Sequence, residues 1–185
     1  MLFRSRAIRL CAQTLNYGQA QETPPRRKRF PLAPLVGEIG DSLGLPRQNI
    51  RWIVEIEARL DVDADRDQLY RVLSNLCRNA VQALESERDI EGEIAVAARR
   101  EGSVTVIEVA DTGPGVPERA RAHLFEAFQG SARKGGTGLG LAIAHELVQA
   151  HGGQIALIGN EGGATFRVTI PDAVVELRRA RRLSA

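Results

Sequence analysis

The chain has 185 residues, which is long enough for one well-packed domain with an extension and too short for two ordinary domains. Its 43% hydrophobic and 26% charged residues are typical of a soluble globular protein. The sequence contains neither the run of roughly 18 apolar residues that spans a membrane nor the apolar segment of a signal peptide. We therefore expect a cytoplasmic domain with no membrane segment. The net charge of +2 combines +6 over residues 1–30 and +2 over residues 172–185 with −6 over residues 31–171, and an acidic centre between basic ends argues against a nucleic-acid partner.

The N-terminal part of the chain predicts a helix followed by a linker. Residues 2–18 carry apolar or small side chains at helical spacing, and their single stripe requires a partner helix. Proline and charged residues then dominate, and we interpret the basic run Arg26–Arg29 as a solvated linker rather than a phosphate-binding patch. The predicted organisation is a helix end over residues 1–20, a linker over 21–34, one domain over 35–171 and a basic tail over 172–185.

The first half of the domain alternates between helix and strand patterns. Residues 35–43 predict a short helix ended by Gly44, and residues 50–60 alternate apolar and polar side chains as a half-buried strand does. Asp65 can cap a long helix whose apolar positions repeat at helical spacing as far as Leu84. Cys77 lies on this helix and is expected in the core. Neither it nor Cys11 has a metal-ligand spacing, which indicates reduced thiols.

The second half predicts two hairpins and one helix. Residues 93–99 and 103–110 form two strands joined by the turn at Glu101–Gly102, and residues 139–150 form a helix that ends at two glycines. Strands over 154–158 and 165–170 complete the domain. Hairpins with helices between them indicate an antiparallel or mixed sheet covered on one face by helices, which is an α+β sandwich.

Two asparagines stand out on the long helix. Asn75 and Asn79 are four residues apart, so both amides lie on one face of a helix that is otherwise largely apolar. They are either surface or helix-bonded amides, or they face a polar ligand, in which case the amide oxygen of Asn79 suits a hard cation such as Mg²⁺.

A glycine-containing loop follows the strand at 103–110. Asp111, Gly113 and Gly115 form an Asp-x-Gly-x-Gly sequence, and glycine permits backbone angles and close approaches that other residues forbid. The segment is either a plain turn or a loop that lines a pocket, with the Asp111 carboxylate accepting hydrogen bonds from an adenine amino group.

A second glycine-rich segment, residues 134–141, leads into the last helix. Backbone N–H groups at a helix N-terminus make an anion cradle, and the placing of Gly138 and Gly140 within the first turn indicates close approach to phosphate. Phe125 and Phe128 precede this segment. They are either ordinary packing or the base of a lid whose Arg133 and Lys134 reach the phosphates.

These four features, in this order, resemble the N, G1, F and G2 boxes of the GHKL ATPase superfamily, and within it the sensor histidine kinases; the resemblance covers residues 32–171. It implies a Bergerat fold, a mixed and largely antiparallel sheet under about three helices, with ATP and Mg²⁺ as cofactors. Asp111 would bind adenine, with Thr165 close by, and Asn79 would ligate Mg²⁺. Asn75 and Arg78 would lie near the phosphates. The remaining implied nucleotide contacts are Gly113, Gly115, Gly136, Thr137, Gly138, Leu139, Gly140 and Leu141.

One residue separates the branches of that superfamily. Hydrolytic members have a glutamate where Asn75 stands, and an amide cannot activate water as a carboxylate does, so the resemblance favours phosphoryl transfer over hydrolysis. The acceptor motif of a histidine kinase is absent, and His123, His145 and His151 are interpreted as structural or surface residues. The implied partners are therefore a histidine-bearing dimerisation domain, of which residues 1–20 would be the end, and a response regulator downstream. The parent protein would be cytoplasmic or the cytoplasmic part of a membrane-bound sensor.

Two other functions fit the same residues less well. A serine kinase of the anti-sigma-factor type shares the fold, but the glycine-rich segment and the His151-Gly152-Gly153 sequence resemble the histidine kinases more closely. A non-catalytic, nucleotide-dependent interaction module is the third possibility. Magnesium-dependent ATP binding and transfer to an added dimerisation domain would separate these functions.

Overall fold

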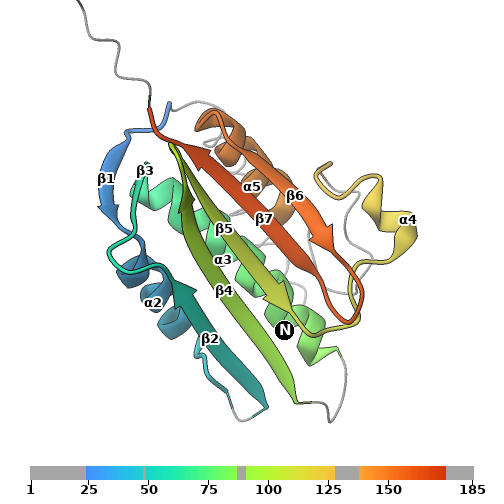
Figure 1. Ribbon diagram of the computed structural model, residues 1–185. Helices are drawn as coiled ribbons and strands as arrows, with labels where there is room; N and C mark the ends of the chain where they lie inside the picture. Colours follow the sequence, from blue (N-terminus) through green and yellow to red (C-terminus); the bar gives the residue numbers. More distant parts are fainter. Residues whose placement is uncertain (1–23, 48, 87–90, 128–137, 174–185) are drawn as a thin grey trace, which may run out of the picture.

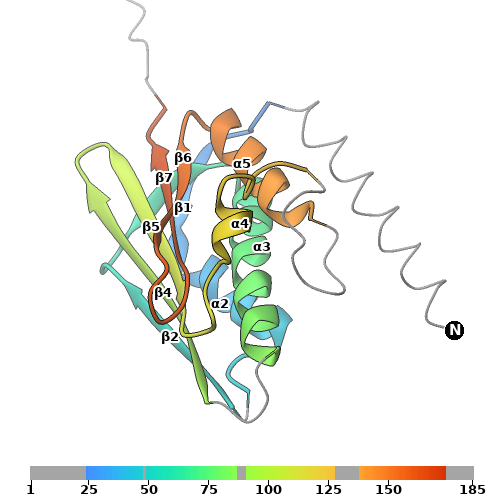
Figure 2. The ribbon, with the colours of Figure 1, turned by 90° about the vertical axis from the view of Figure 1, so that its right-hand side faces the viewer.

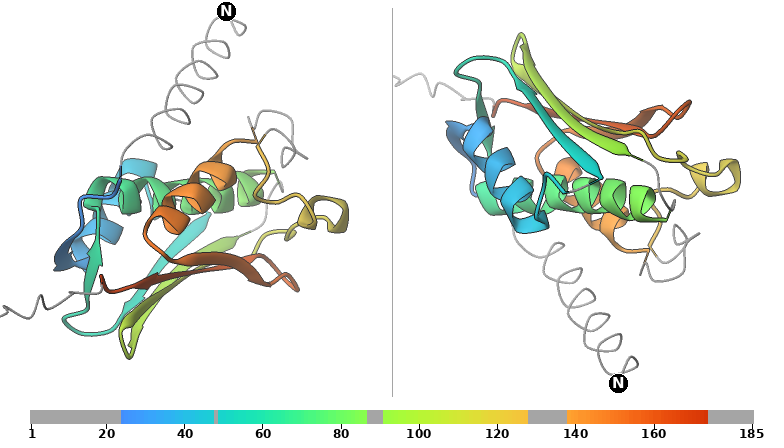
Figure 3. Two further views of the ribbon diagram at one scale, coloured as in Figure 1. Left: turned by 90° about the horizontal axis from the view of Figure 1, so that it is seen from above. Right: turned by 90° about the horizontal axis from the view of Figure 1, so that it is seen from below.

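The computed structural model describes residues 24–47, 49–86, 91–127 and 138–173. Within them, a five-stranded sheet forms one layer and the long helices form the other (Figures 1 and 2). Views from the two ends show the helices on the same side of the sheet (Figure 3). The helices are α2 (Leu32–Leu43), α3 (Arg66–Glu85), α4 (Glu118–Arg121) and α5 (Gly140–Ala150). The strands are β1 (Lys28–Pro31), β2 (Ile50–Ile56), β3 (Asp61–Ala64), β4 (Gly92–Glu101), β5 (Val104–Asp111), β6 (Gln154–Gly159) and β7 (Thr165–Pro171).

The sheet is mixed and largely antiparallel. Its strand order is β2-β4-β5-β7-β6, in which β2 and β4 run parallel and the other neighbours run antiparallel. Strands β1 and β3 form a separate antiparallel pair. The predicted α+β sandwich is therefore confirmed, as is the hairpin of β4 and β5.

Strand alternation and helix amphipathicity build the core between the two layers. Along β7 the buried side chains are Phe166, Val168 and Ile170, and the alternate residues face the other side of the sheet. Helix α3 buries Leu69, Leu73 and Leu76 against that layer. Full burial of each such side chain stabilises the fold by about 1.5–3 kcal/mol.

Helix α3 begins where its cap predicts. The Asp65 carboxylate accepts hydrogen bonds from the main-chain N–H groups of Asp67 and Gln68, both at 3.1 Å, which satisfies two of the free donors of the first turn. The helix then runs for 20 residues and carries both asparagines that the sequence singles out.

The boundary between linker and domain lies earlier than predicted. Residues 28–31 pair with β3, and α2 begins at Leu32, so residues 28–34 belong to the fold and not to a linker. The predicted strand over residues 50–60 ends at Ile56, and a turn with Arg59 at a φ of 60° leads into β3. Strand β1 could not be predicted locally, because it pairs with β3, a segment about 30 residues further along the chain.

Arg27 contradicts the prediction of a solvated basic run. Its side chain is only 17% exposed, and its guanidinium donates to the main-chain carbonyl groups of Asp63 at 2.7 Å and His151 at 2.9 Å, and also to that of Pro171. Arg27 thus joins the ends of β3, α5 and β7. The predicted helix over residues 1–20 and the basic tail beyond residue 173 lie outside the described residues.

In the ranges given above, no helix combines the length and the apolar character that crossing a membrane requires.

Candidate nucleotide-binding site

One face of α3 connects the two glycine-containing segments. A Cβ atom added to Gly140, at the start of α5, would lie 3.6 Å from Oδ1 of Asn75. One added to Gly113 would lie 3.2 Å from Cβ of Ala83. Asn75, Asn79 and Ala83 follow one another at four-residue spacing, and eight helical residues span about 12 Å. The two segments therefore lie at opposite ends of a single helix face, with Asn79 between them.

Asp111 joins the turn of the loop after β5 to the start of β7. Oδ1 of its carboxylate accepts a hydrogen bond from the N–H of Gly113 at 2.9 Å and a longer one from the N–H of Ala164 at 3.4 Å. A Cβ atom on Gly113 would lie only 2.9 Å from that oxygen, so a larger residue there would displace the carboxylate. The structure thus brings together Asp111, Gly113 and α3, as the pocket interpretation of this loop requires.

The far end of the same loop is held by a residue that sequence reasoning missed. The side-chain amide of Asn160, in the β6–β7 connection, accepts from the N–H of Val116 at 2.6 Å and donates to its carbonyl oxygen at 3.2 Å. Gly115 beside it has a φ of 72°. In the sequence Asn160 stands next to Gly159 in a hairpin connection, where asparagine reads as ordinary turn chemistry.

The glycine-rich segment ends in the N-terminus of α5. Gly138 has a φ of 69° and precedes the helix, which begins at Gly140, so the predicted placing of both glycines within the first turn is wrong for Gly138. Leu139 between them is fully buried and anchors the segment in the core, and Leu141 packs partly against that core. Among the described residues, no side chain caps α5 and its first turn has no acidic residue. Its N–H groups and helix dipole suit an anion.

Several predicted site residues lie outside the described residues: Phe128, Arg133, Lys134, Gly136 and Thr137. Arg78 lies within them and is exposed on α3. Phe125 is partly buried against the core, and its ring stacks on that of His145 in α5, with 5.1 Å between the ring centroids. The segment that leads into residues 128–137 is thus packed against α5.

Thr165 does not occupy the position that the resemblance implies. It pairs with Ala110 and alternates with the buried Phe166, so strand alternation directs its side chain to the face of the sheet away from the helices. Its neighbour Ala164 is buried and makes the contact with Asp111. Successive side chains in a strand point to opposite faces of the sheet, so a prediction that is wrong by one residue places the side chain on the wrong face.

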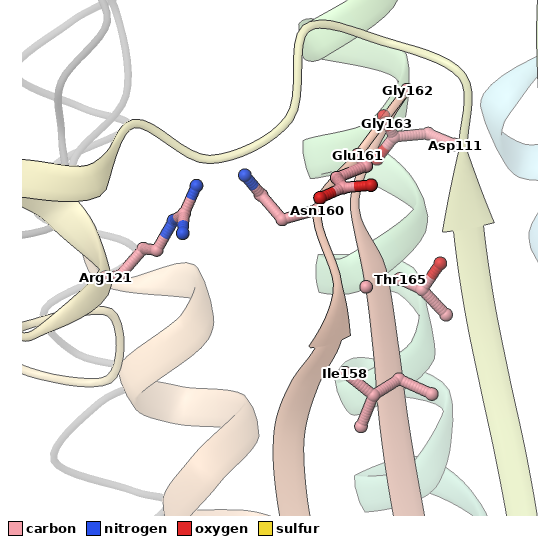
Figure 4. Close-up of a pocket in the computed structure, with 9 residues that line it drawn as sticks. Asp111, Arg121, Ile158, Asn160, Glu161, Gly162, Gly163 and Thr165 are labelled. Atoms are coloured by element: carbon pink, nitrogen blue, oxygen red, sulfur yellow. The ribbon is translucent and has the colours of Figure 1, made fainter.

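A cavity of about 500 Å³ opens beside the β6–β7 connection (Figure 4). Its lining includes Ile158, which is 45% exposed, and Thr165, both from the sheet face opposite the helices, together with Arg121 and part of Asp111. The cavity therefore lies on the other side of the hairpin from the α3 face that carries the asparagines.

Cys77 has no part in the site. It is buried on the core side of α3, and burial raises the pKa of its thiol to about 12, an effect that a backbone hydrogen bond opposes. The predicted core role of Cys77 is confirmed.

Proteins similar to this chain include sensor histidine kinases. The circadian input-output histidine kinase CikA of Synechococcus elongatus is 41% identical over 126 residues, which cover 64% of this chain and 16% of CikA. The sensory histidine kinase/phosphatase NtrB of Escherichia coli O157:H7 is 38% identical over 141 residues, which cover 70% of this chain and 39% of NtrB. The chain thus spans well under half the length of these relatives.

Solved structures of histidine kinases share the fold. The nucleotide-free catalytic domain of ThkA superposes with a TM-score of 0.69 at 29% identity, covering 80% of this chain and 96% of that domain. Full-length ShkA in complex with AMPPNP gives a TM-score of 0.76 at 30% identity, covering 90% of this chain and 36% of ShkA. ThkA in complex with the response regulator protein TrrA gives 0.75 at 25% identity, covering 93% and 50%.

The family match agrees with the geometry of the site. Residues 64–174 match the family described as histidine kinase-, DNA gyrase B- and HSP90-like ATPase. That range contains α3 with both asparagines, the Asp111 loop and the start of α5. It is more than half of the chain, and the chain belongs to this family of ATPases.

Proposed function

We propose that this chain is the ATP-binding kinase domain of a two-component sensor histidine kinase. It transfers the γ-phosphoryl group of Mg-ATP to a histidine on a dimerisation domain. The observation that carries the proposal is the face of α3 that has the Asp111 loop at one end and the N-terminus of α5 at the other. The named relatives and the ShkA complex with AMPPNP support it.

The nucleotide would lie along that face of α3. Adenine would meet the Asp111 carboxylate, which already accepts N–H donors, so an exocyclic amino group is a suitable further donor. The triphosphate would extend past Asn79 to the N–H groups of residues 138–141, where the dipole of α5 favours negative charge. Gly140 leaves open the space beside Asn75 that any other side chain would fill.

A magnesium ion bound with the nucleotide would need few protein ligands, because phosphate oxygens and water fill most of its six positions. The amide oxygen of Asn79 is a hard donor of the kind that suits this ion. The ion would neutralise charge on the phosphate oxygens, and Arg78, Arg133 and Lys134 are predicted to add positive charge near them.

Asn75 decides between hydrolysis and transfer. It lies beside Gly140 at the start of α5, where the phosphates would bind and where a carboxylate would be needed to take a proton from water. An amide lacks that basicity. We therefore propose that the acceptor is an imidazole nitrogen, which forms a bond to the γ-phosphorus while the bond to the bridging oxygen breaks and ADP leaves.

The partners follow from this role. The phosphoryl group would pass from the dimerisation domain to a response regulator, and a similar histidine kinase, ThkA, is known in complex with the response regulator protein TrrA. A reaction that uses ATP, and a free, buried cysteine, support a cytoplasmic site of action. The relatives found are histidine kinases, so neither the anti-sigma-factor type of serine kinase nor a non-catalytic module is favoured.

The test measures transfer and hydrolysis side by side. The chain is incubated with γ-labelled Mg-ATP, alone and with the dimerisation domain of its parent protein, and both labelled protein and released phosphate are counted. We expect slow phosphate release by the chain alone and labelling of the added domain, which is lost when the acceptor histidine is replaced by glutamine. Brisk phosphate release without an acceptor would mean that the domain is a hydrolytic ATPase.

A further inference from the structure

We propose that Asn160 is a positioning residue for nucleotide binding, which holds the loop Asp111–Pro117 in the shape that receives adenine. The proposal rests on the function proposed above and adds to it a residue from outside the four boxes. It is carried by contacts at both ends of the loop and by the space around its glycines.

The loop is anchored at its first end by main-chain pairing. The N–H of Asp111 donates to the carbonyl of Ala164 at 2.9 Å, and the N–H of Thr112 donates to that of Glu93 at 3.1 Å. The hydroxyl of Thr112 accepts from the N–H of Glu93 at 2.9 Å. These bonds continue the sheet, so the start of the loop follows from the strand pairing.

The second end has no strand to pair with, and Asn160 takes that place. Its amide bonds both main-chain groups of Val116, as a neighbouring strand would. The Val116 N–H can only donate and its carbonyl can only accept, so the partner must carry an acceptor and a donor side by side. A carboxamide does so. A carboxylate keeps the acceptor, lacks the donor and sets an oxygen against the Val116 carbonyl.

The glycines show how closely the β6–β7 connection lies against the loop. A Cβ atom on Gly115 would be 3.0 Å from the carbonyl oxygen of Asn160 and 3.1 Å from its Oδ1. One on Gly163 would be 1.7 Å from the carbonyl oxygen of Asp111. Residues 160–163 therefore touch the loop at both of its ends, and Asn160 is the member of this contact that acts through its side chain (Figure 4).

The position of Asn160 separates nucleotide binding from folding. Asn160 is half-buried and is not part of the apolar core. The Val116 side chain packs partly against that core and its carbonyl also accepts from Nε of Arg121 at 3.2 Å, but the Asn160 amide bonds both main-chain groups of Val116. Loss of the amide should release the adenine end of the site and leave the phosphate end, which α3 and α5 build, in place. The two ends can be probed separately.

The experiment compares Asn160→Ala and Asn160→Asp with a control, Glu161→Gln, an exposed neighbour in the same connection. ADP and inorganic tripolyphosphate, each with Mg²⁺, compete with a fluorescent ATP analogue on the full chain. We expect the Kd of ADP to rise about fivefold to tenfold for Asn160→Ala, which loses two hydrogen bonds, and for Asn160→Asp, which loses one and sets a carboxylate oxygen against the Val116 carbonyl. The Kd of tripolyphosphate and the midpoint of thermal unfolding should stay near the wild-type values, as should every value of the control.

Three results would overturn the proposal: an unchanged Kd for ADP, an equal rise for ADP and tripolyphosphate, or a control that behaves like the Asn160 variants. If Asn160→Ala fails to fold, Asn160→Asp, which keeps the acceptor for the Val116 N–H, decides the question. A wild-type chain that binds no nucleotide would instead contradict the proposed function itself.

Discussion

His151 should make the stability of this domain depend on pH. The side chain is 3% exposed, and both ring nitrogens are used: Nε2 accepts from the N–H of Asp65 at 3.0 Å, and Nδ1 lies 2.7 Å from the carbonyl oxygen of Leu147. A carbonyl oxygen only accepts and an N–H only donates, so the folded state needs the neutral ring with its proton on Nδ1.

The environment of the ring favours the same neutral form. Burial lowers the pKa of His151, and the positive charge of Arg27 lowers it further. The hydrogen bond to Leu147 and the carboxylates of Asp65 and Asp63 oppose this effect, and the balance is a lowered pKa. The unfolded chain has the ordinary histidine pKa of about 6.5.

The sign and size of the effect follow from these two states. Well above pH 6.5 His151 is neutral in both states, and it contributes no pH dependence. Below pH 6.5 the unfolded chain binds a proton that the folded domain does not, so the free energy of unfolding falls as the pH falls towards the folded pKa. The slope is at most about 1.4 kcal/mol per pH unit, and at pH 5.5 the loss is at most about 1.4 kcal/mol.

Urea unfolding at a series of pH values between 7.5 and 5.5 measures this loss. The variant His151→Gln keeps a polar side chain but cannot titrate, so the difference between wild type and variant isolates the histidine from the carboxylates and from His123 and His145. The two proteins must share an m-value for the comparison to hold. A free energy of unfolding with the same pH slope in both proteins would refute the assignment of a buried, neutral His151.

Three further predictions use other measurements. Replacing Arg27 by alanine should lower the free energy of unfolding by about 2–4 kcal/mol, because three carbonyl groups lose a charged donor. The control Lys28→Ala, at an exposed residue, should change it by less than about 0.5 kcal/mol. Equal effects of the two substitutions in urea unfolding would argue against the buried role of Arg27. Asp111→Asn should weaken ADP binding by about 1–3 kcal/mol in calorimetry, because a charged acceptor becomes an amide, and an unchanged affinity would contradict the adenine role. In a Cys11→Ser background, Cys77 should react with a thiol reagent only as fast as the domain opens, because burial raises the pKa of its thiol to about 12. Rapid reaction of the folded protein would show instead that the thiol is accessible.

Local signals in the sequence predicted the elements that carry the site. Helix α3 follows from its apolar spacing and from Asp65 as a cap, and the β4–β5 hairpin follows from two alternating segments around Glu101 and Gly102. The Asp111 loop and the start of α5 could be located because glycines and an aspartate mark unusual backbone and ligand contacts within a few residues.

What the sequence did not predict depends on contacts between distant segments. The side chain of Arg27 is buried because three carbonyl oxygens from three elements meet at one point, and nothing in a run of basic residues signals that. Asn160 is a similar case, since its partner Val116 is 44 residues away. Thr165 shows a different limit: the motif gave the correct strand, but only the pairing register decides which of two neighbours faces the site.

The contacts of Arg27 and His151 lie at one end of the α3–α5 helix pair, and Asn75 and Gly140 lie at the other. Helices α3 and α5 pack together, with Asp65 at the start of α3 bonded to His151 at the end of α5, and with Asn75 beside Gly140 at the start of α5. The separations from Asp65 to Asn75 and from Gly140 to His151 correspond to about 15 and 16 Å of helix, so the two helices run antiparallel and their contacts match at both ends. Arg27 donates to the main-chain carbonyl of His151 while the His151 ring accepts from the N–H of Asp65, so side chains from outside and inside the helix pair fix one end of it, and the close approach of Asn75 to Gly140 marks the other.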